Sequence, residues 1–100
     1  MADLMFEDKS KIEEILATSS RLKYLVTQEY GIKPDEILYV RVDGDNFKVD
    51  IETHMAMYRF KAQDTEHVLL KDAETGVMKK EFDPALAQGI YEIVHDFAQE

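Results

Sequence analysis

The stretch that decides the fold is YVRVDGDNFKVDI, residues 39–51, in which apolar and polar residues alternate on both sides of residues 43–46. Alternation with a period of two is typical of half-buried β-strands, and a Gly- and Asp-rich break between two such runs predicts a β-hairpin. If Gly44-Asp45 is the loop, three apolar pairs share one face of the sheet: Val42 with Phe47, Val40 with Val49, and Leu38 with Ile51. A loop at Asp43-Gly44 gives the same faces.

The aspartates of this stretch raise the alternative of a calcium-binding loop. A loop of the EF-hand type has oxygen ligands at its first, third and fifth positions, glycine at the sixth and glutamate at the twelfth. Counted from Asp43, the fifth position is Phe47, the sixth is Lys48 and the twelfth is His54. These three positions fail, and we therefore predict a turn. A looser divalent-ion site that also uses acids of another loop is the alternative.

Before the hairpin, apolar residues recur at helical spacing. Ser10 and Glu13 fit a capping box at the start of this segment, and Gly31 marks its end. Thr18-Ser19-Ser20 interrupts the pattern with residues that favour caps over helix interiors. The sequence therefore leaves open whether residues 10–30 form one helix or two.

After the hairpin, the pattern predicts more strands and a second helix. The alternation breaks near Thr53-His54-Met55, which fits either a turn without glycine or a β-bulge. Gly76 can supply the positive φ of a hairpin loop at 72–76. Asp83-Pro84 predicts a helix start, because Asp is a good N-cap and Pro is tolerated at the first helical position. The additional strands are expected at 56–61, 68–71 and 77–82.

These segments predict one α+β domain over residues 1–100, in which residues 1–9 carry no periodic pattern and could be disordered. Strands in succession flanked by helices, without β-α-β alternation, favour an antiparallel sheet of four to five strands. We expect two layers, with the N-terminal helical region and the C-terminal helix covering the sheet. The predicted core is Leu38, Val40, Val42, Phe47, Val49, Ile51, Tyr58, Phe60, Leu86, Ile90, Val94 and Phe97.

Composition limits the class of ligand and the compartment. The formal charge is −9, from 21 acidic and 12 basic residues, so nucleic acid and anionic membranes are disfavoured as direct partners. No apolar run approaches the roughly 18 residues of a transmembrane helix, and the first ten residues are acidic where a signal peptide is basic. The chain has no cysteine, which excludes disulfides and thiolate metal sites. We expect a cytoplasmic protein.

No catalytic or cofactor motif stands out. His54, His67 and His95 lack the spacing of a metal site, although they could still meet in space at a metal or ligand site. The serines lie in or near the first helical segment, there is no G-x-S-x-G elbow, and no glycine-rich loop could hold a phosphate. We therefore predict a protein that is not an enzyme and has no cofactor or metal.

Two kinds of residue are candidates for partner binding. Tyr39, Met57 and Arg59 are expected on the outward face of the sheet, and their residue types are enriched in interface cores. Acidic residues are expected on two surfaces, a rim formed by the 43–46 turn and the 62–66 loop, and one face of the last helix. These acids are Asp43, Asp45, Asp64 and Glu66 on the rim, and Glu92 and Asp96 on the helix. A turn should tolerate Lys in place of Asp43 or Asp45.

The function expected from these features is non-enzymatic protein binding. We predict a small acidic inhibitor or adaptor that occupies a basic surface of a partner protein, comparable in type to phage-encoded inhibitors. The alternatives are a small-ligand or metal-binding module and, behind that, a small hydrolytic enzyme. We also expect a homodimer, because a finite sheet leaves unpaired strand edges and no strand here carries a proline.

Overall fold

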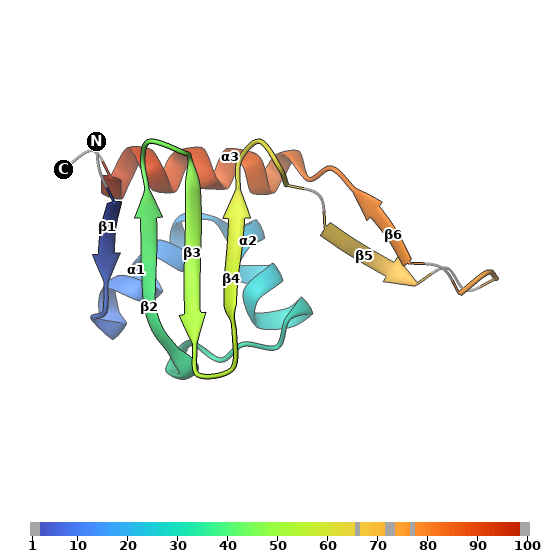
Figure 1. Cartoon of the computed structure of the whole chain (residues 1–100), viewed down its shortest axis with the longest axis horizontal. Helices are drawn as coiled ribbons and strands as arrows, with labels where there is room; N and C mark the ends of the chain where they lie inside the picture. Colours follow the sequence, from blue (N-terminus) through green and yellow to red (C-terminus); the bar gives the residue numbers. More distant parts are fainter. Residues whose placement is uncertain (1–2, 66, 72–73, 77, 99–100) are drawn as a thin grey trace.

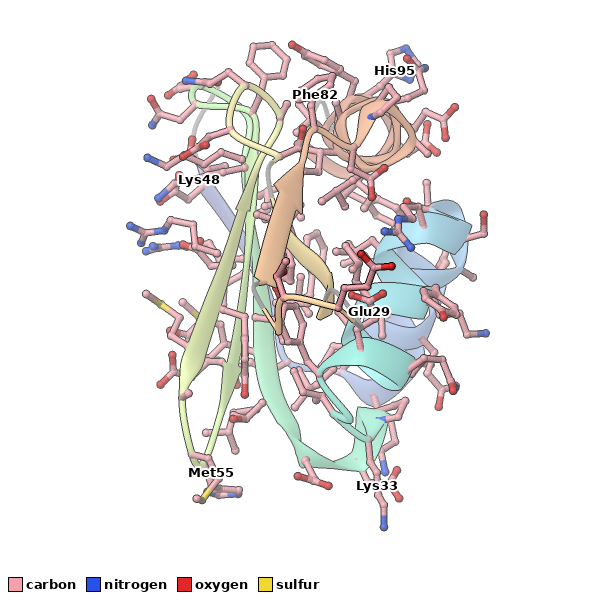
Figure 2. All side chains as sticks on the ribbon, turned by 90° about the vertical axis from the view of Figure 1, so that its right-hand side faces the viewer. Glu29, Lys33, Lys48, Met55, Phe82 and His95 are labelled. Carbon is pink, nitrogen blue, oxygen red and sulfur yellow. The ribbon has the colours of Figure 1, made fainter. Side chains whose placement is uncertain are left out.

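The computed structural model describes residues 3–65, 67–71, 74–76 and 78–98. Its main sheet is antiparallel and four-stranded, in the order β1 (Asp3–Phe6), β2 (Ile37–Asp43), β3 (Lys48–Thr53) and β4 (Met57–Lys61). Helices α1 (Lys9–Thr18), α2 (Ser20–Tyr24) and α3 (Pro84–Ile93) lie together on one side of it (Figures 1 and 2). The predicted α+β class, antiparallel sheet and two layers are confirmed.

The central hairpin is present, but its predicted register is wrong. Val42 pairs with Val49 and Val40 pairs with Ile51, because the loop contains four residues, 44–47, instead of two. Phe47 therefore belongs to the loop, where it has a positive φ of 48° and an exposed side chain. The apolar faces of both strands were correctly assigned, since a shift by an even number of residues preserves them.

The prediction of Leu38 as a core residue is also wrong, because β2 begins with a β-bulge. The register shifts between Ile37 and Tyr39, which places Ile37 opposite Thr53 and Tyr39 opposite Glu52. A bulge inserts one unpaired residue and turns the side chains before it to the other face. Ile37 is consequently buried and Leu38 is exposed, the reverse of the prediction.

The fourth strand of the sheet comes from the N-terminus. β1 pairs with β2, with Leu4 opposite Val42 and Phe6 opposite Val40, although no strand was predicted within residues 1–9. α1 then begins at Lys9, with Asp8 as its N-cap instead of the predicted Ser10. The Asp8 carboxylate accepts hydrogen bonds from the backbone N–H and the hydroxyl of Ser10, each at 2.9 Å.

The last two strands leave the main sheet. β5 (His67–Lys71) and β6 (Met78–Glu81) form the predicted hairpin, with Gly76 at a φ of 73° in its loop. They pair with each other and make a separate two-stranded sheet beyond β4 (Figure 1). The predicted extension of one sheet through these strands is therefore wrong.

The helical region at 10–30 is divided at Ser19. Ser19 ends α1 and caps α2, where its hydroxyl accepts a hydrogen bond from the Leu22 N–H at 3.1 Å. α2 continues into a π-helical turn, η1 (Leu25–Glu29), and Gly31 follows at a φ of 66° as the predicted stop. A short 3-10 turn, η2 (Pro34–Glu36), leads into β2.

α3 lies close against the junction of α1 and α2. A Cβ added at Gly89 would lie 2.0 Å from the Ser19 hydroxyl oxygen, so only glycine allows this approach. Asp83 caps α3 as predicted and accepts from the Leu86 N–H at 2.9 Å, and it also forms an ion pair with Arg21 of α2. α3 continues into the π-helical turn η3 (Val94–Ala98).

The core lies between the sheet and the helices. Tyr58 was predicted to be buried, but it is only half-buried and packs against the margin of the core. The N-terminal helices contribute more of the core than predicted. Its buried residues include Ile12, Ile15, Leu16, Leu22, Leu25, Val26, Val40, Val42, Val49, Ile51, Phe60, Leu86, Ile90, Ile93, Val94 and Phe97.

Candidate functional site

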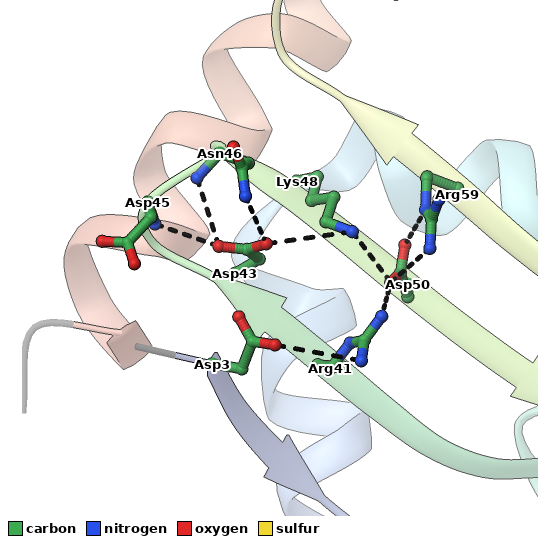
Figure 3. A network of polar contacts seen from close by, with 8 residues as sticks. All are labelled: Asp3, Arg41, Asp43, Asp45, Asn46, Lys48, Asp50 and Arg59. Carbon is green, nitrogen blue, oxygen red and sulfur yellow. Dashed lines mark hydrogen bonds and ion pairs between the residues drawn. The ribbon is translucent and has the colours of Figure 1, made fainter. Parts of the chain in front are cut away.

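The 43–47 segment is a turn held together by its first aspartate. The buried Asp43 carboxylate accepts hydrogen bonds from the backbone N–H groups of Asp45 and Asn46, each at 3.1 Å, and from the Asn46 side-chain amide at 2.9 Å (Figure 3). Burial acts to raise the pKa of Asp43, but the hydrogen bonds from Asn46 and Asp45 outweigh it and hold the pKa below its ordinary value. Asp43 therefore does not project from the predicted acidic rim.

The outer face of the sheet carries a network of charged residues around Asp50. Arg41, Asp50 and Arg59 are directly opposite one another on β2, β3 and β4, so register alone brings them together. The Asp50 side chain has 0% of its surface exposed and accepts from Arg41 Nη2 at 2.7 Å and Arg59 Nε at 2.9 Å (Figure 3). Lys48 Nζ lies 3.5 Å from the same carboxylate.

The protonation of Asp50 follows from these neighbours. Burial acts to raise its pKa, yet the hydrogen bonds from Arg59 and Arg41 and the charge of Lys48 hold the pKa below its ordinary value. The carboxylate thus stays ionised and joins three strands on the face that no helix covers. Sequence reasoning missed this network, because a two-residue loop would have placed Arg41 opposite Lys48.

The predicted apolar interface residues share the outer face. Tyr39 and Met57 both lie opposite Glu52 and so form one cross-strand row with it. Arg59 lies in the adjacent row, but its guanidinium group already pairs with Asp50. The structure therefore places Tyr39, Met57 and Arg59 together, with Arg59 serving the sheet itself.

Two of the four predicted rim acids lie exposed at the same end of the sheet. The Ala62 N–H donates to the Phe47 carbonyl at 2.9 Å, which joins the turn at 44–47 to the segment after β4. Asp45 and Asp64 are exposed there, whereas Asp43 is buried within its own turn. Glu66 lies outside the described residues.

A further surface joins the turn to α3. The rings of Phe47 and Tyr91 lie 5.2 Å apart between centroids, and 39% and 45% of these residues is exposed. Glu92 and Asp96 are exposed on the same helix and its η3 continuation, beside a surface hollow of about 660 Å³. We call this surface the α3 face; it comprises Phe47, Gln88, Tyr91, Glu92, His95 and Asp96, with Thr18 closing the hollow. Sequence reasoning found its acids but missed both rings.

The histidines that can be placed lie apart. Met55, next to His54, and His95 are at opposite ends of the molecule (Figure 2), and the side chain of His67 is outside the described part. His95 Nδ1 lies 3.2 Å from Asp96 Oδ1. Within the described residues, no group of three or more His, Asp or Glu side chains could hold a metal ion. Nor is any helix in this part of the chain long and apolar enough to cross a membrane.

Comparisons with known proteins identified no relative of this chain. No family model matches the chain, and no curated protein and no solved structure is significantly similar to it.

Proposed function

We propose that the protein is a non-enzymatic inhibitor or adaptor that acts in the cytoplasm and binds a basic surface of a partner protein through its α3 face. The observation that carries this proposal is the exposed Phe47–Tyr91 pair bordered by carboxylates. Exposed aromatic side chains supply large contact areas at interfaces, and the residues that dominate binding energy are enriched in tyrosine. Paired rings held at the surface fit this role.

The acids around the rings supply the second part of the argument. Glu92 and Asp96 stand four residues apart, and the chain has no Lys or Arg between Glu81 and Glu100. Like charges at this spacing, near the negative end of the helix dipole, are each unfavourable by a few tenths of a kcal/mol. A Lys- or Arg-rich partner surface would relieve that repulsion and would associate faster through electrostatic attraction.

Capture from a cell lysate at low salt, followed by mass spectrometry, tests the proposal. Two double variants have the same net charge: Glu92→Lys/Asp96→Lys on the α3 face, and Glu13→Lys/Glu36→Lys on exposed positions elsewhere. We expect proteins with basic surfaces to be captured by the wild type and by the Glu13/Glu36 variant, and to be lost with the Glu92/Asp96 variant.

Two other results would count against the proposal. Equal loss with both variants would show that only net charge matters. Full capture by both variants would mean that the acids serve solubility and that binding occurs elsewhere. Tyr91→Ala separates the aromatic contribution, because it removes an anchor without changing charge and should mainly raise the dissociation rate.

A further inference from the structure

A second hollow lies at the turn end of the outer face of the sheet. Its volume is about 250 Å³, and it is lined by Asn46 of the turn, Lys48 of β3, Lys61 of β4 and Gln63 of the segment after β4. Each of these side chains ends in an amine or an amide, so all four can donate hydrogen bonds. Among the described residues that line this hollow, none is acidic, in contrast to the hollow of the α3 face.

Strand register brings the two lysines of this hollow together. Lys48 and Lys61 are directly opposite each other on β3 and β4, and both are half-buried. A backbone hydrogen bond of 2.9 Å joins the turn to the segment after β4, and Asn46 and Gln63 complete the lining at this end. Like charges directly opposite on neighbouring strands are destabilising. An anion bound between the two ammonium groups would relieve this repulsion.

The carboxylates near the hollow are already engaged by other groups. Asp50 accepts hydrogen bonds from two arginines, and Asp43 accepts them within its own turn (Figure 3). Lys48 Nζ lies 3.5 Å from Asp50 and 3.8 Å from Asp43, and both distances are longer than a normal hydrogen bond. Among the described residues, no carboxylate forms an ion pair with Lys61. Both ammonium groups therefore keep N–H donors for an additional anion.

The strands around the hollow carry an excess of positive charge, although the whole chain has a net charge of −9. The two rows of outward-facing residues nearest the turn on β2, β3 and β4 contain four cations, Arg41, Lys48, Arg59 and Lys61, and two anions, Asp43 and Asp50. Asp3 extends these rows at the far β1 edge and lowers the excess from two to one. Asp45 and Asp64 are exposed at the same end of the sheet but do not line the hollow, so they limit its affinity for anions without closing it.

We propose that this hollow binds a phosphate group, either as inorganic phosphate or as the phosphate monoester of a phosphorylated side chain. A phosphorylated side chain carries a charge of about −1.5 to −2 at pH 7 and three strong acceptor oxygens. The two ammonium groups match that charge, since lysine binds phosphate as a point charge. The Asn46 amide is held by its hydrogen bond to Asp43 at 2.9 Å and keeps a second N–H for a phosphate oxygen. This site is separate from the α3 face and does not depend on the proposed function.

Titration with sodium phosphate at constant ionic strength, followed by NMR, tests this site. We expect the side-chain amide signals of Asn46 and Gln63 to shift in the wild type, and sodium chloride at the same ionic strength to leave them unchanged. Lys61→Gln should weaken phosphate binding about tenfold, because it removes one of the two ammonium groups. Lys33→Gln is the matched control, since it changes the net charge equally and Lys33 lies at the opposite end of the molecule from Lys48 (Figure 2).

A variant with an effect of opposite sign guards against misfolding as the explanation. Asp64→Asn removes an exposed negative charge near the hollow and should bind phosphate more tightly than the wild type, which a damaged fold would not do. The two sources of phosphate are separated by comparing inorganic phosphate with N-acetyl-phosphoserine amide. Tighter binding of the phosphoserine compound assigns the site to a phosphorylated side chain, and tighter binding of inorganic phosphate assigns it to the free ion.

Three results would overturn the proposal. Equal weakening by Lys61→Gln and Lys33→Gln would show that only net charge matters. Amide shifts no larger with phosphate than with chloride would show that the hollow does not select phosphate. Shifts confined to residues away from Asn46 and Gln63 would place any phosphate binding elsewhere.

Discussion

Asp50 shows how a charged side chain can be fully buried on a sheet face that no helix covers. The long side chains of Arg41, Lys48 and Arg59 surround it and exclude water while supplying opposite charge. Breaking a buried ion pair by removing one partner is strongly destabilising, because the remaining charges stay desolvated and uncompensated. The stability of the outer face should therefore depend on this carboxylate more than on any exposed acid.

We predict that Asp50→Asn lowers the free energy of unfolding by about 3 kcal/mol, in line with the loss of one partner of a buried ion pair. Urea denaturation followed by circular dichroism measures this change. Glu52→Gln, a charge-matched change two positions along the same strand, should alter the free energy of unfolding by less than about 0.5 kcal/mol. Equal effects of the two substitutions would contradict the importance of the network.

The same carboxylate makes stability depend on pH. The pKa of folded Asp50 lies below its ordinary value of 3.8, so its stabilising contribution is complete above that value and is lost as the pH falls through the folded pKa. We expect unfolding free energy to fall more steeply below about pH 4 in the wild type than in Asp50→Asn. Parallel curves for the two proteins would argue against a depressed pKa.

Asp43 and Asp45 are two positions apart at the start of the turn but should respond differently to reversal. Asp43 is buried and accepts three hydrogen bonds, so Asp43→Lys should cost about 2 kcal/mol or more, contrary to the expectation from sequence that a turn tolerates the change. Because the side chain of Asp45 is exposed, the same change there should lower the free energy of unfolding by less than Asp43→Lys does. Thermal unfolding of the two variants decides the matter, and a tolerant Asp43 would show that its hydrogen bonds contribute little.

At the scale of elements, the sequence patterns predicted which face of each strand is buried better than they predicted which residues pair between strands. Alternation identified β2, β3, β4 and both strands of the β5–β6 hairpin, and the caps at Asp83 and Gly31 were found from local chemistry. The register was missed because the Asp43 hydrogen bonds that define a four-residue loop involve side-chain geometry absent from the pattern. β1 was missed because four residues, DLMF, are too few to show periodicity.

The acids of the α3 face were predictable from the sequence, but the contact between Phe47 and Tyr91 was not, because it depends on the tertiary fold.

The contact between Gly89 and Ser19 sets the spacing of the helices. Gly89→Ala places a Cβ 2.0 Å from the Ser19 hydroxyl oxygen, and we expect a loss of about 1–3 kcal/mol from overpacking. Ser19→Gly removes the obstructing side chain at the expense of the α2 cap. A double-mutant cycle should show that Gly89→Ala is much less damaging in the Ser19→Gly background. Strict additivity would mean that the two positions do not clash.

For the whole molecule, the net charge of −9 should oppose the folded state through self-repulsion. Salt screens exposed charges, with a Debye length that falls from about 30 Å at 0.01 M to about 10 Å at 0.1 M. We therefore predict that the melting temperature rises over this range, whereas binding to a basic partner weakens. Calorimetry at the two salt concentrations measures the first effect. A melting temperature that falls with added salt would show that favourable ion pairs dominate instead.

The contact between Phe6 and Phe97, whose ring centroids are 6.0 Å apart, has a consequence for synthesis on the ribosome. β1 and η3 lie 91 positions apart in the chain at this contact, yet they pack side by side at one edge of the structure (Figure 1). Loops of such length close slowly compared with local hairpins. The β2–β3–β4 meander can form while translation continues, but its apolar face stays uncovered by α3 until the final helix has emerged. During that interval the nascent chain should depend on chaperones more than its small size suggests.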